Sequence, residues 1–240
     1  MNNTPILTFD CDWAPNFIIE NIAEELIKNN IKSTWFVTNN SPIIQKLQKN
    51  PLFELGIHPN FESDSTQGKN FEDIMKNLLD IVPDAKSIRT HRLLQSSTQL
   101  KKYQKYGIEN DVTLYLPNTP NLQPHYSEYY NLTRFPFFWE DDIEMKEEYL
   151  WSLSNSFFHE DGLKIFNFHP VHVYLNSRNM KNYEELKKDI GLENIDKKNV
   201  EQYINHDKNG ARDFLKEIIS FLENKETFTI QSFKQKNNLK

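Results

Sequence analysis

Short apolar runs alternate with stretches of helical periodicity along the first half of the chain. Runs rich in β-branched and aromatic residues predict buried strands over Ile6–Phe9, Ser33–Thr38, Phe53–His58, Ser87–His91 and Val112–Leu116. Between them, apolar residues recur every three to four positions, which predicts helices over Asn16–Lys28, Ile43–Gln48, Phe71–Val82 and Ser97–Tyr106.

The second half of the chain is less regular. An irregular loop is expected over the proline-rich segment Pro117–Pro124, and Pro136 interrupts the apolar run Asn131–Trp139, which favours a bulged or edge strand. The later pattern predicts helices over Glu144–Phe158, Tyr183–Ile190 and Asp207–Asn224, strands over Leu163–Phe168 and Glu226–Phe233, and a loop over Pro170–Leu175. This alternation of strands and helices predicts a single α/β domain over residues 1–240, built on a parallel sheet or barrel.

Composition narrows the class of protein. The 240 residues carry a formal net charge of −6, which argues against a nucleic-acid partner. No segment approaches the roughly 20 apolar residues of a transmembrane helix, and the first residues do not resemble a signal peptide. The single cysteine, Cys11, is expected to be a buried apolar group and fits a reducing compartment, so a cytoplasmic location is predicted.

Side chains that bind metals or move protons follow several predicted strands. Asp10 and Asp12 come first, two residues apart, where side chains of a strand share one face. Two carboxylates so close repel each other unless a cation or a shared proton intervenes, which indicates a metal-and-base site. Later strand ends carry His58, Arg89, His91, His169 and His172. Because parallel β/α folds gather active sites at the carboxyl ends of their strands, these side chains are expected to converge.

Five segments resemble the motifs of the polysaccharide deacetylases, carbohydrate esterase family 4, whose NodB-type fold is a distorted (β/α) barrel. They are Thr8–Asp12 (TFDCD), Gly56–Phe61 (GIHPNF), Arg89–His91 (RTH), Phe135–Asp142 (FPFFWEDD) and Asn167–Pro170 (NFHP). The phrases GIHPNF, RTH and NFHPVH also resemble the smaller WbmS-like branch, which is associated with surface-polysaccharide genes.

The resemblance implies a role for each matching residue. Asp10 would be the catalytic base, His169 the general acid, and Arg89 the partner that holds Asp10. Asp12 and His58 would bind a divalent metal. The family pattern also implies that one of two acidic residues, Asp141 or Asp142, supports Arg89; the sequence does not say which.

The third metal ligand is open between two residues. Many family members have a second histidine where this chain has Glu62, and His91 replaces a residue that is usually apolar. We favour His91. One aspartate and two histidines suit zinc, although cobalt, nickel and iron also accept these ligands.

Three further side chains are candidates for substrate binding. Trp13 stands where many members have glycine, so the entrance near the metal is expected to be narrower. Trp139 lies beside the acidic pair and is either a sugar-stacking platform or part of the core. His172 either contacts the substrate or bonds to nearby backbone.

The resemblance thus implies a zinc-type hydrolase that removes an N-acyl group, most often acetyl, from an amino sugar. A nucleotide- or lipid-linked precursor of a surface polysaccharide, such as lipopolysaccharide, is the expected substrate. Two alternatives stay open: a deformylase or other non-peptide amide hydrolase on the same fold, and a non-catalytic module that binds glycan or metal.

Overall fold

The computed structural model of the chain describes residues 5–147, 151–207 and 209–240. In its first half, strands and helices alternate as the sequence predicts. The elements are β1 (Ile6–Asp10), α1 (Asn16–Lys28), β2 (Ser33–Val37), α2 (Pro42–Gln48), β3 (Phe53–Ile57), α3 (Phe71–Ile81), β4 (Ser87–Ile88), α4 (Ser97–Tyr103) and β5 (Asn110–Asp111). The strand β4 is shorter than predicted because it ends before Arg89. The strand predicted over Val112–Leu116 is wrong in position, since β5 covers Asn110–Asp111 and ends before Val112.

The second half departs more from the predicted pattern. Its elements are β6 (His125–Ser127), β7 (Leu132–Arg134), β8 (Trp139–Glu140), α5 (Asp141–Glu147), β9 (Ile165–Phe168), α6 (Pro170–Leu175), α7 (Lys181–Asp189), α8 (Ala211–Leu222) and α9 (Ile230–Lys236). The run around Pro136 divides into β7 and β8, as a proline without an N–H requires. The helix predicted over Glu144–Phe158 is wrong in extent: α5 ends at Glu147, residues 148–150 lie outside the described part, and a 3-10 turn covers Ser156–His159.

Two predictions about element type are wrong. The segment after His169 is the helix α6 rather than a loop, with Pro170 in its first turn. The strand predicted over Glu226–Phe233 is the start of α9. There the Thr229 side chain accepts from the backbone of Ser232, and the Ser232 side chain accepts from the backbone of Thr229. This capping box favours the helix over the alternating pattern.

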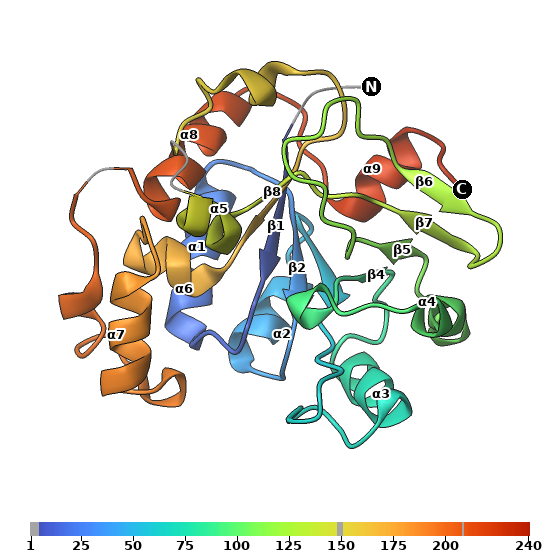
Figure 1. The fold of residues 1–240 in the computed structure, drawn as a ribbon, viewed down its shortest axis with the longest axis horizontal. Coiled ribbons are helices and arrows are strands. Elements are labelled where there is room, and N and C mark those ends of the chain that lie inside the picture. The colour runs from blue at the N-terminus through green and yellow to red at the C-terminus, as the bar shows by residue number, and fades with distance from the viewer. Residues whose placement is uncertain (1–4, 148–150, 208) are drawn as a thin grey trace.

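The described strands form one nine-stranded sheet in the order β6-β7-β5-β4-β3-β2-β1-β9-β8 (Figure 1). All neighbouring pairs run parallel except β6 and β7. The sheet curls, and a parallel bridge between Tyr115 and Phe137 joins the segment after β5 to the segment before β8. This curled sheet is the distorted barrel that the resemblance implies.

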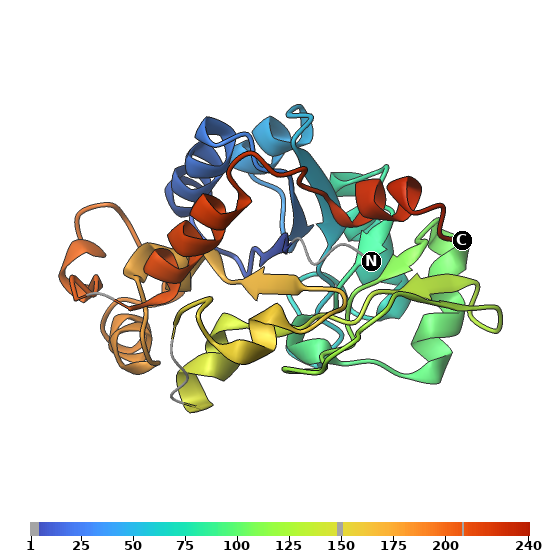
Figure 2. The same ribbon diagram turned by 90° about the horizontal axis from the view of Figure 1, so that it is seen from above.

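Helices cover the outside of the curled sheet (Figure 2). Helix α6 packs against α1, α7 and α8, and α2 packs against α1 and β3. The start of α9 lies at the amino ends of β2 and β3, where the amide of Ile230 donates to Thr34 and that of Gln231 donates to Glu54. In the described ranges no helix is long and apolar enough to cross a membrane.

Strand alternation separates an aromatic outer layer from a polar interior. On β1, Phe9 faces the helices and stacks on Trp35 with ring centroids 4.3 Å apart. Its neighbours Thr8 and Asp10 face inward, where both are hydrogen bonded to Asn167 of β9. The period of two along each strand therefore places polar groups inside the barrel, below its carboxyl rim.

Candidate active site

The strand-end residues do converge at the carboxyl rim. Asp10 ends β1, His58 follows β3, Arg89 follows β4 and His169 follows β9. These strands run parallel within one sheet, so their carboxyl ends share one rim. The convergence predicted from the sequence is what the structure shows.

Asp12, His58 and His91 form a compact group of metal-ligating atoms. Oδ1 of Asp12 lies 3.1 Å from Nε2 of His58 and 3.2 Å from Nδ1 of His91. This oxygen is buried and has no hydrogen-bond partner among the described residues. Burial alone would raise the pKa of Asp12, but the two histidines and His169 outweigh it and hold that pKa well below its usual value. One carboxylate and two imidazoles around a buried, unsatisfied oxygen fit a divalent transition metal such as zinc.

Glu62 lies apart from this group. Its carboxylate pairs with the exposed guanidinium of Arg92 at 2.7 Å, whereas the imidazole of His91 reaches Asp12. The geometry therefore favours His91 over Glu62 as the third ligand.

A left-handed turn, rather than the strand, positions Asp12. The strand β1 ends at Asp10, and Asp12 and Trp13 adopt φ values of 40° and 56°. The expectation that Asp10 and Asp12 share one strand face is therefore wrong, although both carboxylates approach His58. Left-handed backbone costs about 1–2 kcal/mol per non-glycine residue, so a glycine in place of Trp13 would adopt this turn with less strain.

Trp13 follows Asp12 in this turn and borders the metal-ligating group. Its amide donates to Oγ1 of Thr38 at 3.1 Å, which holds the turn against the end of β2. Its ring meets the His91 ring edge to face, with centroids 5.3 Å apart. The half-buried indole thus forms one wall beside His91, where a glycine would leave space.

Asp10 is buried and held on both of its oxygens. Nη1 of Arg89 donates to Oδ1 at 3.0 Å, and Nδ2 of Asn167 donates to Oδ2 at 2.9 Å. Oδ1 also lies 3.7 Å from Nδ1 of His58, whose Nε2 faces Asp12. The His58 ring is therefore placed between the two aspartates, an arrangement in which a second carboxylate orients a metal-ligating histidine.

Arg89 is fully buried inside the barrel. Its guanidinium lies 4.5 Å from the ring centroids of both Phe36 and Phe137, and its Nε donates to the carbonyl of Val112 at 3.1 Å. Buried charges persist when they are paired and hydrogen bonded, and the carboxylate of Asp10 supplies the opposite charge.

The acidic pair does not support Arg89 as the resemblance implied. Asp141 instead pairs with His169: its Oδ1 lies 2.7 Å from Nδ1, and its Oδ2 accepts from the backbone amide of His169 at 2.8 Å. Burial alone would lower the pKa of His169, but Asp141 outweighs it and raises that pKa well above its usual value. Nε2 of His169 faces Asp12 at 3.6 Å, so the positively charged ring is presented to the metal-ligating group.

Two residues of the site were not identified from the sequence. Asn167 Nδ2 donates to Oε1 of Glu140 at 2.9 Å as well as to Asp10, and Asn167 Oδ1 accepts from Arg89. Burial, followed by the nearby carboxylate of Asp142, raises the pKa of Glu140 to about 8. The period of two on β8 is the signal that could have found Glu140, because it points inward when Trp139 points outward.

Trp139 packs in the aromatic layer outside the barrel. Its side chain is 2 % exposed, and its ring centroid lies 4.9 Å from the ring centroids of both Phe168 and Phe214. No open ring face is left for a sugar, so a stacking role for Trp139 has no support in this geometry.

His172 lies below the site rather than at its surface. Its Nδ1 is 3.3 Å from Oγ of Ser177, and its ring contacts that of Tyr183 with centroids 4.6 Å apart. Burial lowers the pKa of His172 to about 3, so the ring is neutral. Burial also raises the pKa of the Tyr183 hydroxyl to about 12, and the negative charge of Asp12 adds to the shift. The sequence pattern did not single out Tyr183, which contacts His172.

The site therefore combines three kinds of chemistry within a few side chains. It has a donor set for a divalent cation, a fixed buried carboxylate on one side of His58, and an imidazolium on the other side of Asp12. Such a set suits hydrolysis in which one group removes a proton and another supplies one.

Known proteins resemble this chain in fold and, more distantly, in sequence. The family model of WbmS-like polysaccharide deacetylases matches residues 7–187. A Bordetella bronchiseptica structure, described as a polysaccharide deacetylase involved in O-antigen biosynthesis, is 27% identical over 90% of both chains, with a TM-score of 0.82. A family 4 acetyl xylan esterase from Clostridium thermocellum, solved with a cobalt ion, is 14% identical over 98% of this chain and 92% of that chain; its TM-score of 0.52 shows likeness of fold alone. No curated protein matches the chain.

Proposed function

The chain belongs to the WbmS-like polysaccharide deacetylase family, and we propose that it is a metal-dependent hydrolase that removes an N-acyl group, most simply acetyl, from an amino sugar. The observation that carries this proposal is the metal-type donor set of Asp12, His58 and His91, flanked by a buried carboxylate and by a carboxylate-paired imidazole. A module that only binds a glycan needs neither of the two flanking groups, and a module that only binds a metal does not need the imidazole that pairs with Asp141.

In this proposal the three ligands would hold one divalent cation. When bound, such a cation polarises an acyl oxygen and lowers the pKa of a coordinated water toward neutrality. Asp10 takes the proton from the attacking water, with Arg89 and Asn167 fixing its carboxylate by hydrogen bonds to both oxygens.

His169 performs the opposite proton transfer. Its Nε2 faces the site while its Nδ1 is bonded to Asp141, so the proton on Nε2 is available for the departing nitrogen. Expulsion of an unprotonated amide nitrogen is very unfavourable, which is why an acid is needed on this side. Each positioned proton transfer of this kind contributes about 10²–10⁴-fold in rate.

The test is acetate release from N-acetylated amino sugars by the metal-loaded protein and by Asp10→Asn. We expect the native protein to turn over at least one such sugar. The variant should lose at least about 100-fold in kcat while it retains its metal, because Asp10 is not one of the three ligands. Undiminished turnover in Asp10→Asn would refute the assignment of the base. Release of formate but not acetate from matched substrates would redirect the proposal to a deformylase on the same site.

The biological setting is a proposal of the same kind. The related Bordetella protein is described as acting in O-antigen biosynthesis, and we place this chain in the assembly of a surface polysaccharide. The cytoplasmic location and zinc as the metal stay predictions from the sequence.

A further inference from the structure

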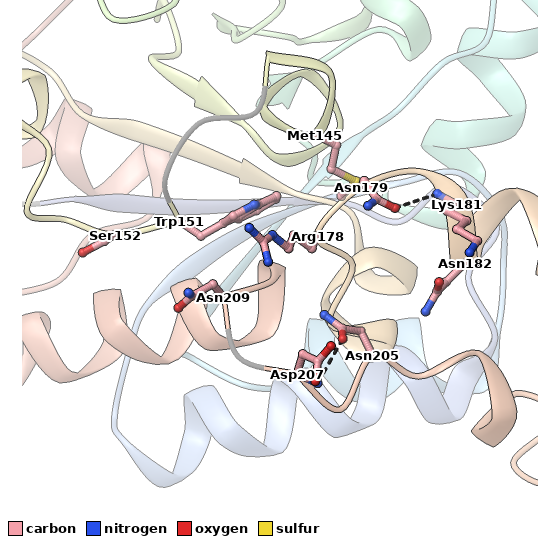
Figure 3. Close-up of a pocket in the computed structure, with 10 residues that line it drawn as sticks. All are labelled: Met145, Trp151, Ser152, Arg178, Asn179, Lys181, Asn182, Asn205, Asp207 and Asn209. Carbon is pink, nitrogen blue, oxygen red and sulfur yellow. Dashed lines mark hydrogen bonds between the residues drawn. The ribbon is translucent and has the colours of Figure 1, made fainter.

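A polar cavity of about 630 Å³ is lined by residues of α5, of the start of α7 and of the segment before α8 (Figure 3). Its described walls come from three places: α5 with residues 151 and 152, the connection from α6 into α7, and residues 205, 207 and 209 before α8. Met145 and Trp151 represent the first wall, Arg178 and Lys181 the second, and Asp207 the third. The volume lies within the range of about 300–1,000 Å³ that small-molecule sites occupy.

Two cations line this cavity without a partner among the described residues. Neither Arg178 nor Lys181 lies within 4.0 Å of a carboxylate in the described ranges, and Asp207 is the carboxylate of the lining. Figure 3 shows the Arg178 side chain extending toward the middle of the cavity. Among the described residues of the lining, the two cations therefore outnumber the one carboxylate.

Asparagines supply most of the remaining polar lining. Asn182 and Asn205 are tied to the walls, since their amide nitrogens donate to the carbonyls of Tyr203 and Asn176 at 2.9 Å and 3.0 Å. Asn179 accepts from the backbone amide of Lys181 at 3.0 Å, which fixes the start of α7. These bonds fix the walls on both sides of the exposed connection that carries Arg178 and leads to Lys181 at the start of α7.

Two helices connect the cavity lining to residues of the site. Helix α5 begins at Asp141, the partner of His169, and reaches the cavity at Met145 one turn later. Helix α7 lines the cavity with its first residues, and Tyr183, two positions after Lys181, contacts His172 beside the site.

We propose that this cavity binds a phosphate or diphosphate group attached to the amino sugar whose N-acyl group occupies the site. The inference rests on the proposed function and names its substrate class: a glycosyl phosphate, whether nucleotide- or lipid-linked. Arg178 and Lys181 pair with the phosphate oxygens, as guanidinium and ammonium groups do in phosphate sites. A neutral glycan would instead use an open aromatic face, and the aromatic ring of this cavity, Trp151, is 8 % exposed and packs on Trp139.

The test compares substrates with and without phosphate on the double variant Arg178→Ala, Lys181→Ala. The substrates are N-acetylglucosamine, its 1-phosphate, its uridine diphosphate derivative and a short-chain polyprenyl diphosphate derivative. We expect KM for the phosphorylated sugars to rise by about 10–100-fold, the worth of one hydrogen bond to a charged group. The kcat values, and KM for the free sugar, should not change. The phosphorylated substrate whose KM rises most in the double variant shows whether the natural carrier is a nucleotide or a lipid.

The matched control is Lys187→Ala, Lys188→Ala, which removes two cations from the same helix outside the cavity lining. An equal rise in KM in the control, or an unchanged KM in the double variant, would overturn the proposal. Calorimetry measures the affinity of both variants for N-acetylglucosamine 1-phosphate, and this tests the cavity even when no sugar is turned over. Weaker binding in the first variant alone would support the cavity while the hydrolase assignment failed.

Discussion

The pairing of Asp141 with His169 predicts how the rate depends on pH. Only the protonated imidazole can donate to the departing amine, so activity is present below the pKa of His169 and is lost as the pH rises through it. Asp141 is the main cause of the raised pKa of His169. The variant Asp141→Asn keeps the size of the side chain and an acceptor oxygen but removes the charge. The pKa of His169 should therefore fall, and the alkaline limb of the kcat/KM profile should move to lower pH.

The expected size of this shift follows from the contact. Nδ1 and Oδ1 are 2.7 Å apart, and because both charges are spread over several atoms their effective separation is about 4 Å. At an effective dielectric constant of about 20, such a pair interacts by about 4 kcal/mol, which is about 3 pKa units as an upper bound. The hydrogen bond kept by asparagine retains part of this, so we expect a shift of about 1–3 units.

The assay is a kcat/KM profile with a titration of the His169 ring followed by NMR. The matched control is Asp142→Asn at the next position, because the carboxylate of Asp142 raises the pKa of His169 less than Asp141 or Asp12 does. Its alkaline limb should move much less than that of Asp141→Asn. An alkaline limb that stays in place in Asp141→Asn would show that His169 is not the acid or that Asp141 does not set its pKa.

Three further predictions concern the rest of the site. In metal-free protein, Glu140 carries a raised pKa of about 8, so the folded state retains a proton that the unfolded chain releases above about pH 4.3. The free energy of unfolding should then fall as the pH rises toward 8, by at most about 1.4 kcal/mol per pH unit. Denaturant titrations at pH 5, 7 and 9 measure this slope, and Glu140→Gln should lack it. The same dependence of stability on pH in the native protein and in Glu140→Gln would contradict the assignment. Asn167→Ala removes the amide that donates to the buried carboxyl groups of Asp10 and Glu140. It should lower the free energy of unfolding by about 1–3 kcal/mol in the same titrations. A loss below the measurement error would refute the role of Asn167 in holding these two groups. His91→Ala should lose the metal while Glu62→Gln retains it, as followed by zinc titration; the opposite result would make Glu62 the ligand.

The sequence predicted the site because its residues directly follow apolar strands. His58, Arg89 and His169 each come directly after the last residue of a strand, and parallel pairing then brings them to one rim without further information. The first half of the fold was predicted well for the same reason: its strands are buried on both faces and its helices have clear apolar stripes.

The features that sequence reasoning missed depend on pairing in three dimensions. Asp141 and His169 are 28 positions apart, and the parallel pairing of β8 with β9 is what brings them into contact. The left-handed turn at Asp12 and Trp13 contains no glycine, which is the residue that would have indicated such a turn in the sequence. The alternating apolar residues of Glu226–Phe233 predict a strand, but α9 begins at Ile230. The reciprocal hydrogen bonds of Thr229 and Ser232 start this helix, and a Thr-Ser pair at this spacing is only a weak sequence signal for a helix start.

The central claim is that Asp12, His58 and His91 hold a catalytic divalent metal, and metal content tests it most directly. Elemental analysis would compare the native protein with His58→Ala and with His125→Ala, a matched change at an exposed histidine far from the ligating group. We expect about one equivalent of a transition metal in the native protein and in His125→Ala, and none in His58→Ala. A native protein that holds no metal after incubation with zinc or cobalt, or a His58→Ala variant that keeps a full equivalent, would contradict the account.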